Sequence, residues 1–150
     1  MIDVTNFEEL VARWPHIRLD QIPSEYIAKM TPDTLDLFNT MVRDGERRNG
    51  WVHRINSTWR KPGTGQHPLG RAIDFVFYTF DPGDVNVLTQ YNFVKTYAWG
   101  GIGIYPEWNA PGLHVDTRQG GDHIATWFQD KFKAYHSLAQ YEDVYGVKIV

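Results

Sequence analysis

Three side chains of this sequence have the types and spacing of a metal site: His67, Asp74 and His114. Asp74 lies within an apolar run, where an isolated carboxylate is costly unless it is paired or bound to a cation. His67 stands seven residues earlier, at the end of a glycine-rich loop, so a turn would let the two side chains converge. Two imidazoles and one carboxylate, with a fourth position left to water, form the ligand set of a catalytic zinc site. The residues alone leave open a buried His–Asp network without metal.

A second polar pair follows further along the chain. His114 and Asp116 are two residues apart in a predicted strand, so both side chains point to the same face and Val115 points to the other. Two polar groups on one face predict that this face lines a cleft.

Hydrophobic spacing predicts the elements that must hold these residues. We expect helices at residues 6–14, 31–49, 87–98 and 124–132, and strands at 51–57, 72–80, 102–105 and 113–117. The last of these helices rests on the spacing of Ile124, Trp127, Phe128 and Phe132. A loop containing Pro62 and a turn containing Pro82 break the chain between elements. The order of these elements, with helices first and then strands mixed with helices, predicts an α+β fold. We expect a small, mostly antiparallel sheet flanked by helices.

Composition narrows the possible function. A chain of 150 residues fits one domain, and its net charge of −3 argues against a nucleic-acid partner. Because cysteine is absent, any metal must bind His, Asp, Glu or water. No apolar run reaches the length of a membrane span, which predicts no membrane insertion. The first residues lack the basic and apolar pattern of a signal peptide, so we expect a protein made in the cytoplasm. Without a coiled-coil pattern, we expect a monomer.

Four segments together resemble a known family. They are STWR at residues 57–60, GQHPLGRAIDF at 65–75, GGIGIYP at 100–106 and LHVDTR at 113–118. Their order and residue types resemble the M15-type zinc peptidases, which include D-alanyl-D-alanine carboxypeptidases and phage endolysins of the Hedgehog/DD-peptidase fold. The similarity covers residues of about 51–128, and Trp127 resembles a tryptophan that often follows these motifs.

This resemblance implies a role for several residues. It implies that His67, Asp74 and His114 bind Zn²⁺, and that Arg60 contacts the substrate and polarises the scissile carbonyl. Such a guanidinium would stabilise the oxyanion of the tetrahedral intermediate. The implied activity is hydrolysis of a peptide bond in the peptidoglycan stem, with a D-amino acid at the bond. The stem peptide is the expected partner. The expected setting is the cell wall or periplasm, in keeping with a phage-encoded lysin.

The sequence departs from the family pattern at one position. Many members carry an acidic residue three positions before the second zinc histidine, whereas this chain has Pro111. We therefore expect Asp116 to be the acidic group of the site, with Glu107 as the rival general base. Asp116 could instead only orient His114.

Aromatic residues beside the motifs are candidates for substrate binding. We expect Trp59, Trp108 and Tyr105 to line the substrate groove, and Trp51 and Trp99 to belong to the core. Two alternatives to the peptidase stay open. One is a catalytically inactive zinc-fold protein that binds the cell wall or serves in a phage particle, as Pro111 suggests. The other is a metal-free binder of a sugar or peptide.

Overall fold

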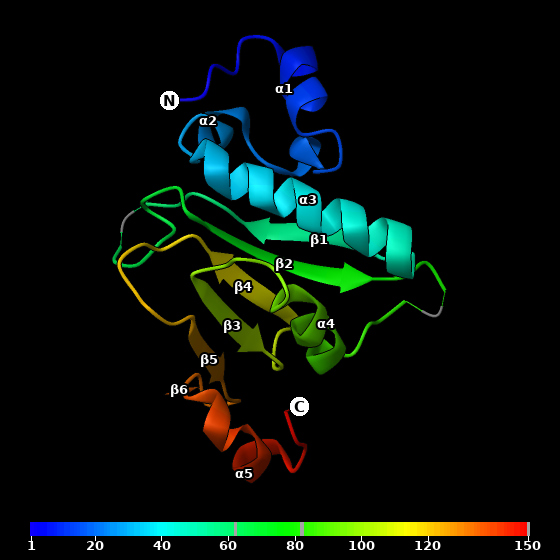
Figure 1. Ribbon diagram of the computed structural model, residues 1–150, viewed down its shortest axis with the longest axis vertical. Coiled ribbons are helices and arrows are strands. Elements are labelled where there is room, and N and C mark those ends of the chain that lie inside the picture. The colour runs from blue at the N-terminus through cyan, green and yellow to red at the C-terminus, as the bar shows by residue number, and fades with distance from the viewer. Residues whose placement is uncertain (62, 82, 150) are drawn as a thin grey trace.

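The computed structural model describes residues 1–61, 63–81 and 83–149 (Figure 1). Pro62 and Pro82, which we expected in a loop and in a turn, lie outside the described residues. The helices are α1 (Phe7–Arg13), α2 (Ser24–Ile27), α3 (Pro32–Asn49), α4 (Val87–Val94) and α5 (Tyr141–Tyr145), with two short 3₁₀ turns, η1 (Leu19–Gln21) and η2 (Leu138–Gln140). The strands are β1 (Val52–Ser57), β2 (Ala72–Tyr78), β3 (Gly101–Tyr105), β4 (Gly112–Asp116), β5 (Ala125–Gln129) and β6 (Tyr135–His136).

The six strands form one sheet in the order β1-β2-β4-β3-β5-β6. All neighbouring pairs are antiparallel except β3 and β5, which run parallel. An α+β fold with a mostly antiparallel sheet is therefore confirmed, and the parallel pair was not expected. In the centre of the sheet Asp74 of β2 lies directly opposite His114 of β4.

Alternation along the central strands separates a packed face from a functional face. Leu113 and Val115 of β4 are fully buried, as are Phe75 and Phe77 of β2. The Phe75 ring packs edge-on against Phe38 of α3, so these side chains face the helices. Successive strand residues point to opposite faces, so Asp74, His114 and Asp116 share the other face.

Helix α3 crosses the sheet beside β1 and β2 (Figure 1). Its buried stripe includes Leu35, Phe38 and Met41, each with no exposed area. The helix begins after Thr31 and ends at Gly50, whose φ of 66° is the left-handed conformation that favours glycine. Both ends agree with the sequence prediction.

The prediction of a helix at residues 124–132 was wrong. Residues 125–129 form strand β5 instead, and β5 pairs with β3 so that Trp127 lies opposite Gly103. Of the four residues with helical spacing only Phe128 is fully buried, while Ile124 and Phe132 are exposed. The segment Ala-Thr-Trp-Phe-Gln combines a β-branched and two aromatic residues, which favour a strand. A tight turn then leads from β5 into β6, with Asp130 accepting hydrogen bonds from the backbone of Phe132 and Ala134.

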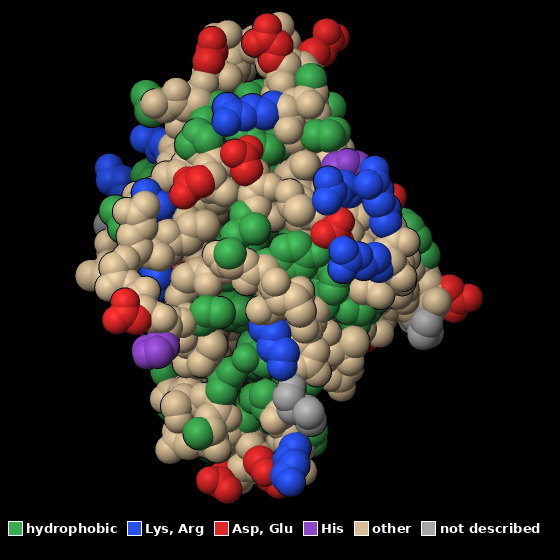
Figure 2. All heavy atoms as spheres, in the orientation of Figure 1, with side chains coloured by type: hydrophobic (Ala, Val, Ile, Leu, Met, Phe, Trp, Pro, Cys, Tyr) green, Lys and Arg blue, Asp and Glu red, His purple; other side chains and the backbone are tan. Residues whose placement is uncertain are grey.

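The surface carries charges of both signs, and Lys and Arg side chains gather over the C-terminal part of α3 (Figure 2). Arg47 and Arg48 are exposed there, as expected of a solvated helix face. Trp99 is buried as predicted, and Trp51 is half-buried against the core. In the described part of the chain, no helix has both the length and the apolar character needed to cross a membrane.

Acid should destabilise the fold through His53. This residue is buried on β1, and its Nε2 accepts a hydrogen bond from the backbone N–H of Arg18 at 3.1 Å. Burial, with a smaller effect of Arg18, lowers the pKa of His53 from 6.5 to about 4. The unfolded chain binds this proton first, so stability is lost as the pH falls from 6.5 towards 4. We expect His53 to contribute a loss of about 3 kcal/mol between pH 7 and pH 4.

Denaturant unfolding across this pH range measures the effect. His53→Gln, which keeps a hydrogen-bond acceptor but cannot titrate, should lose less stability than the native protein over the same range. Equal losses in the two proteins would contradict the assignment.

Candidate metal centre

The structure brings His67, Asp74 and His114 together. One ligand atom from each of them lies within 4.8 Å of the others, and all three side chains are buried. The Nε2 atom of His67 is 3.2 Å from Asp74 Oδ1, and the Nδ1 atom of His114 is 2.8 Å from the same oxygen. The convergence predicted from the sequence is confirmed.

The loop that carries His67 is fixed at several points. Trp59 Nε1 donates to the carbonyl of Pro68 at 3.1 Å, and the backbone N–H of Thr31 donates to the carbonyl of Gly70 at 2.9 Å. Gly70 has a φ of 71°, and a Cβ at this position would lie 1.9 Å from the carbonyl oxygen of Lys29. Only glycine fits this contact without movement of the backbone, so Gly70 anchors the loop against the segment before α3.

The hydrogen bonds around the cluster place a proton on the outer nitrogen of each histidine. His67 Nδ1 lies 2.6 Å from the carbonyl oxygen of Thr58, which can only accept, so this nitrogen carries the proton. His114 Nε2 lies 2.7 Å from Asp116 Oδ2, an ionised carboxylate that also only accepts. The opposite nitrogens, His67 Nε2 and His114 Nδ1, face Asp74 Oδ1, and each would present a lone pair there once it carries no proton.

A buried carboxylate such as that of Asp74 requires a cation beside it. Burial alone would raise the pKa of Asp74, but hydrogen bonds with His114 and His67 outweigh it and keep the carboxyl ionised. Burial also opposes charge on His114, but the flanking carboxylates of Asp116 and Asp74 raise its pKa overall. A proton shared with His114 or a metal ion can supply the cation. The chemistry of the donor set, two nitrogens and one oxygen, fits Zn²⁺.

Asp116 lies behind His114 and away from the opening of the site. It has no exposed area, and its two oxygens accept hydrogen bonds from His114 and from the Arg118 guanidinium. Burial would raise its pKa, but these partners outweigh it and hold the pKa well below that of a free aspartate. The geometry therefore favours the orienting role that the sequence left open for Asp116 over that of general base.

Glu107 lies away from the cluster. It is exposed in the loop between β3 and β4, and its Oε1 accepts a hydrogen bond from the Tyr145 hydroxyl at 2.9 Å. It borders a different hollow, beside Lys131 and Val144. For the hydrolase that the sequence resemblance implies, we expect Glu107→Gln to change the rate of hydrolysis by less than about twofold, because loss of a true general base costs about 10²–10⁴-fold.

Release of amino groups from cell wall, compared between Glu107→Gln and the native protein, measures this. A fall of 100-fold or more at unchanged zinc content would restore Glu107 as the base.

A cleft of about 360 Å³ opens over the cluster. It is lined by Arg60 and residues 64–67 and by His114, Tyr105, Arg118, Trp127 and Tyr135. Its volume falls in the range of small-ligand sites. A larger cavity of about 560 Å³ lies between the N-terminal segment and the start of α3, but it contains no histidine and none of the cluster residues. The chemistry therefore points to the smaller cleft.

Arg60 lies beside the cluster. Its Nη1 lies 3.6 Å from Asp74 Oδ2 and donates to the Ser57 hydroxyl at 3.3 Å. The side chain is 57% exposed, so it can move towards a ligand in the cleft.

The three predicted aromatic residues differ in their placement. Tyr105 lines the cleft, and burial raises the pKa of its hydroxyl, so this group stays protonated and can donate a hydrogen bond. Trp108 stacks on the Tyr105 ring at 4.4 Å and supports it from behind. Trp59 borders a neighbouring hollow of about 230 Å³ that shares Arg60 with the main cleft.

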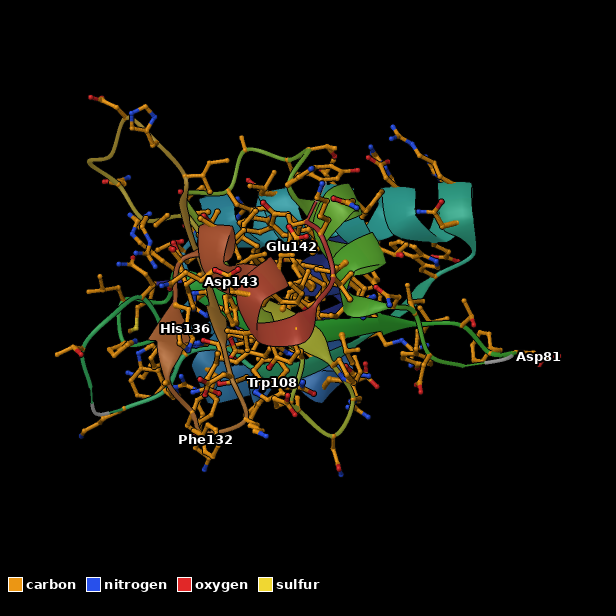
Figure 3. The ribbon with its side chains drawn as sticks, turned by 90° about the horizontal axis from the view of Figure 1, so that it is seen from below. Asp81, Trp108, Phe132, His136, Glu142 and Asp143 are labelled. Carbon is orange, nitrogen blue, oxygen red and sulfur yellow. The ribbon has the colours of Figure 1, made fainter. Side chains whose placement is uncertain are left out.

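Among the cleft residues that the sequence analysis did not assign to the site are one cation and two aromatic residues: Arg118, Trp127 and Tyr135. Trp127 donates from Nε1 to the Tyr105 hydroxyl at 3.2 Å, and its ring lies 5.2 Å from that of His114. Tyr135 belongs to the β5–β6 hairpin, which also carries Phe132 and His136 (Figure 3). Strand alternation in residues 125–129 could have indicated that Trp127 lies on the same face as the cluster. The prediction of a helix in this segment prevented that inference.

Comparison with known proteins adds no assignment. The chain matches no protein-family model, no curated protein and no solved structure. What is established is an α+β fold with a buried His67–Asp74–His114 group that could hold a metal ion.

Proposed function

We propose that this protein is a zinc-dependent peptidase that hydrolyses a peptide bond of the peptidoglycan stem. The observation that carries the proposal is that His67 Nε2, Asp74 Oδ1 and His114 Nδ1 converge in a buried group, and that His67 and His114 also line an open cleft. A site with three protein ligands and access for solvent is typical of catalytic zinc, whereas structural zinc has four protein ligands. The choice of substrate and of the Hedgehog/DD-peptidase fold rests on the resemblance of the sequence motifs.

His67, Asp74 and His114 would hold the ion. When bound, zinc would supply Lewis-acid chemistry and would lower the pKa of a bound water to about 7. Thr58 and Asp116 keep the two imidazoles in the tautomers that present a lone pair to the metal.

Two side chains of the cleft have the chemistry to stabilise a developing oxyanion. The Arg60 guanidinium stands beside Asp74, and the Tyr105 hydroxyl lines the same cleft. Both are hydrogen-bond donors at neutral pH. Fixed donors aimed at a developing negative charge contribute strongly to acyl-transfer catalysis.

A specific observation favours a second candidate, a zinc protein that binds the cell wall without cutting it. Among the described residues that line the cleft, none is Asp or Glu, and both candidate bases lie elsewhere. Pro111 stands where many members of the family carry an acidic residue.

One experiment separates the candidates. Zinc content is measured on the purified protein, and new amino groups are counted after incubation with purified peptidoglycan, before and after chelation and after zinc is restored. A peptidase should contain about one zinc per chain and lose and regain activity with it. Zinc with binding to peptidoglycan fragments but no new amino groups would support the second candidate. A protein that retains no zinc would exclude both.

A further inference from the structure

Arg118 is held more rigidly than the other arginine of the cleft. Its Nε donates to Asp116 Oδ1 at 2.8 Å, and its Nη2 donates to Asp116 Oδ2 at 2.7 Å. The guanidinium also lies over the Trp127 ring, at 5.0 Å from the centroid. A two-pronged pair with a buried carboxylate and an aromatic face fixes both the position and the plane of the group.

Gly101 provides the space for this pair. A Cβ at this position would lie 2.5 Å from Asp116 Oδ2 and 2.7 Å from Arg118 Nε. Any other residue would displace the carboxylate or the guanidinium, so the backbone of β3 is adapted to the pair.

The pair leaves one end of the guanidinium free. Asp116 occupies the edge formed by Nε and Nη2, and Nη1 forms no hydrogen bond with any described residue. The side chain is 35% exposed and lines the cleft. The remaining N–H donors of a guanidinium match the two oxygens of a carboxylate.

The charge of the cleft also favours an anion. Asp116 neutralises Arg118, whereas a divalent ion together with Arg60 would outweigh the single negative charge of Asp74. A metal-loaded cleft is therefore cationic. Because His114 bonds to Asp116 and Asp116 bonds to Arg118, the free donors lie close to the metal ligands.

We propose that Arg118 is a specificity residue that binds a carboxylate of the substrate close to the scissile bond. The inference rests on the proposed function and narrows its substrate class to stem peptides with a free carboxylate at this place. Two sources share this chemistry: the C-terminus of the stem peptide, and the free carboxylate that a glutamyl residue carries within it.

Binding to the zinc-loaded full chain tests the inference without requiring hydrolysis. The probes are a synthetic stem peptide, its C-terminal amide, and the same peptide with the glutamyl carboxylate amidated. Calorimetry should show that the native protein binds one of the two amides about 10–100-fold more weakly than the free acid, which is the usual effect of losing a charge-assisted hydrogen bond. The weaker amide identifies the carboxylate that Arg118 binds.

Arg118→Gln should bind all three peptides with equal affinity and still contain zinc. Arg71→Gln is the matched control, because Arg71 contacts Asp33 and the carbonyl of Thr117 outside the cleft, and it should discriminate as the native protein does. Arg118→Lys keeps a cation beside Asp116 but loses the planar fork, so it should lose most of the discrimination and serves if Arg118→Gln does not fold.

Three results would overturn the inference: native protein that binds both amides as tightly as the free acid, native protein that binds none of the peptides, or variants at Arg118 that keep the discrimination. Failure of the proposed function looks different. If Arg118 discriminates between the peptides but no amino groups are released, this inference stands and the proposed peptidase activity is wrong. If the protein cleaves the free acid and both amides at equal rates, the proposed peptidase activity stands and this inference is wrong.

Discussion

Replacing His114 with alanine should abolish both zinc retention and hydrolysis of peptidoglycan. His114 offers one of the three candidate ligand atoms and contacts Asp74 through Nδ1 and Asp116 through Nε2. Its removal leaves two protein ligands and two buried carboxylates that face each other without their shared partner. The fall in zinc affinity should exceed the 10–100-fold that is typical for loss of a residue that only orients a ligand. Metal analysis after dialysis, together with the amino-group assay, measures both effects.

His123→Ala is the matched control for this variant. His123 is exposed in the segment between β4 and β5 and lies outside the cluster. It should retain about one zinc per chain and full activity. The assignment of His114 as a ligand fails if His114→Ala also retains one zinc per chain.

The second large effect is expected from Asp116→Asn. The amide cannot accept from both His114 and the Arg118 fork, so His114 is no longer held in the tautomer that presents Nδ1 to the metal. Zinc affinity should fall by about 10–100-fold. The free energy of unfolding should fall by an amount near the lower end of the roughly 3–5 kcal/mol typical for breaking a buried ion pair, because the partly exposed Arg118 can regain water.

Zinc titration and denaturant unfolding measure these two effects. Asp33→Asn removes a carboxylate that pairs with Arg71 at 3.5 Å on the surface, where Asp33 is 60% exposed. It should cost less than about 1 kcal/mol and leave zinc affinity unchanged. Equal effects of the two substitutions would show that Asp116 does not orient His114.

The sequence was informative about the cluster because the residue pattern within each strand and the pairing between the strands place the same side chains together. The apolar run around Asp74 predicted a buried strand, and the spacing of His114 and Asp116 correctly placed both on one face. The antiparallel pairing of β2 and β4 then puts Asp74 opposite His114. Convergence of the three ligands needed only this register and one turn after His67.

The sequence was less informative where several elements meet. Spacings of three and four residues in Ile124, Trp127, Phe128 and Phe132 suit a helix, but the parallel pairing of β5 with β3 decides the structure, and that contact is distant along the chain. The role of Asp116 likewise depends on Arg118, whose orientation follows from Trp127 and from the missing side chain of Gly101. Spacing along one strand cannot reveal that both oxygens of a carboxylate already accept hydrogen bonds from other side chains.

Anomalous diffraction at the zinc edge, from crystals grown with zinc, tests the central claim most directly. One peak should lie among His67 Nε2, Asp74 Oδ1 and His114 Nδ1, with solvent on the side of the cleft. Crystals that show no anomalous peak at this place, or a peak bound only by other residues, would contradict the metal centre and with it the proposed hydrolase.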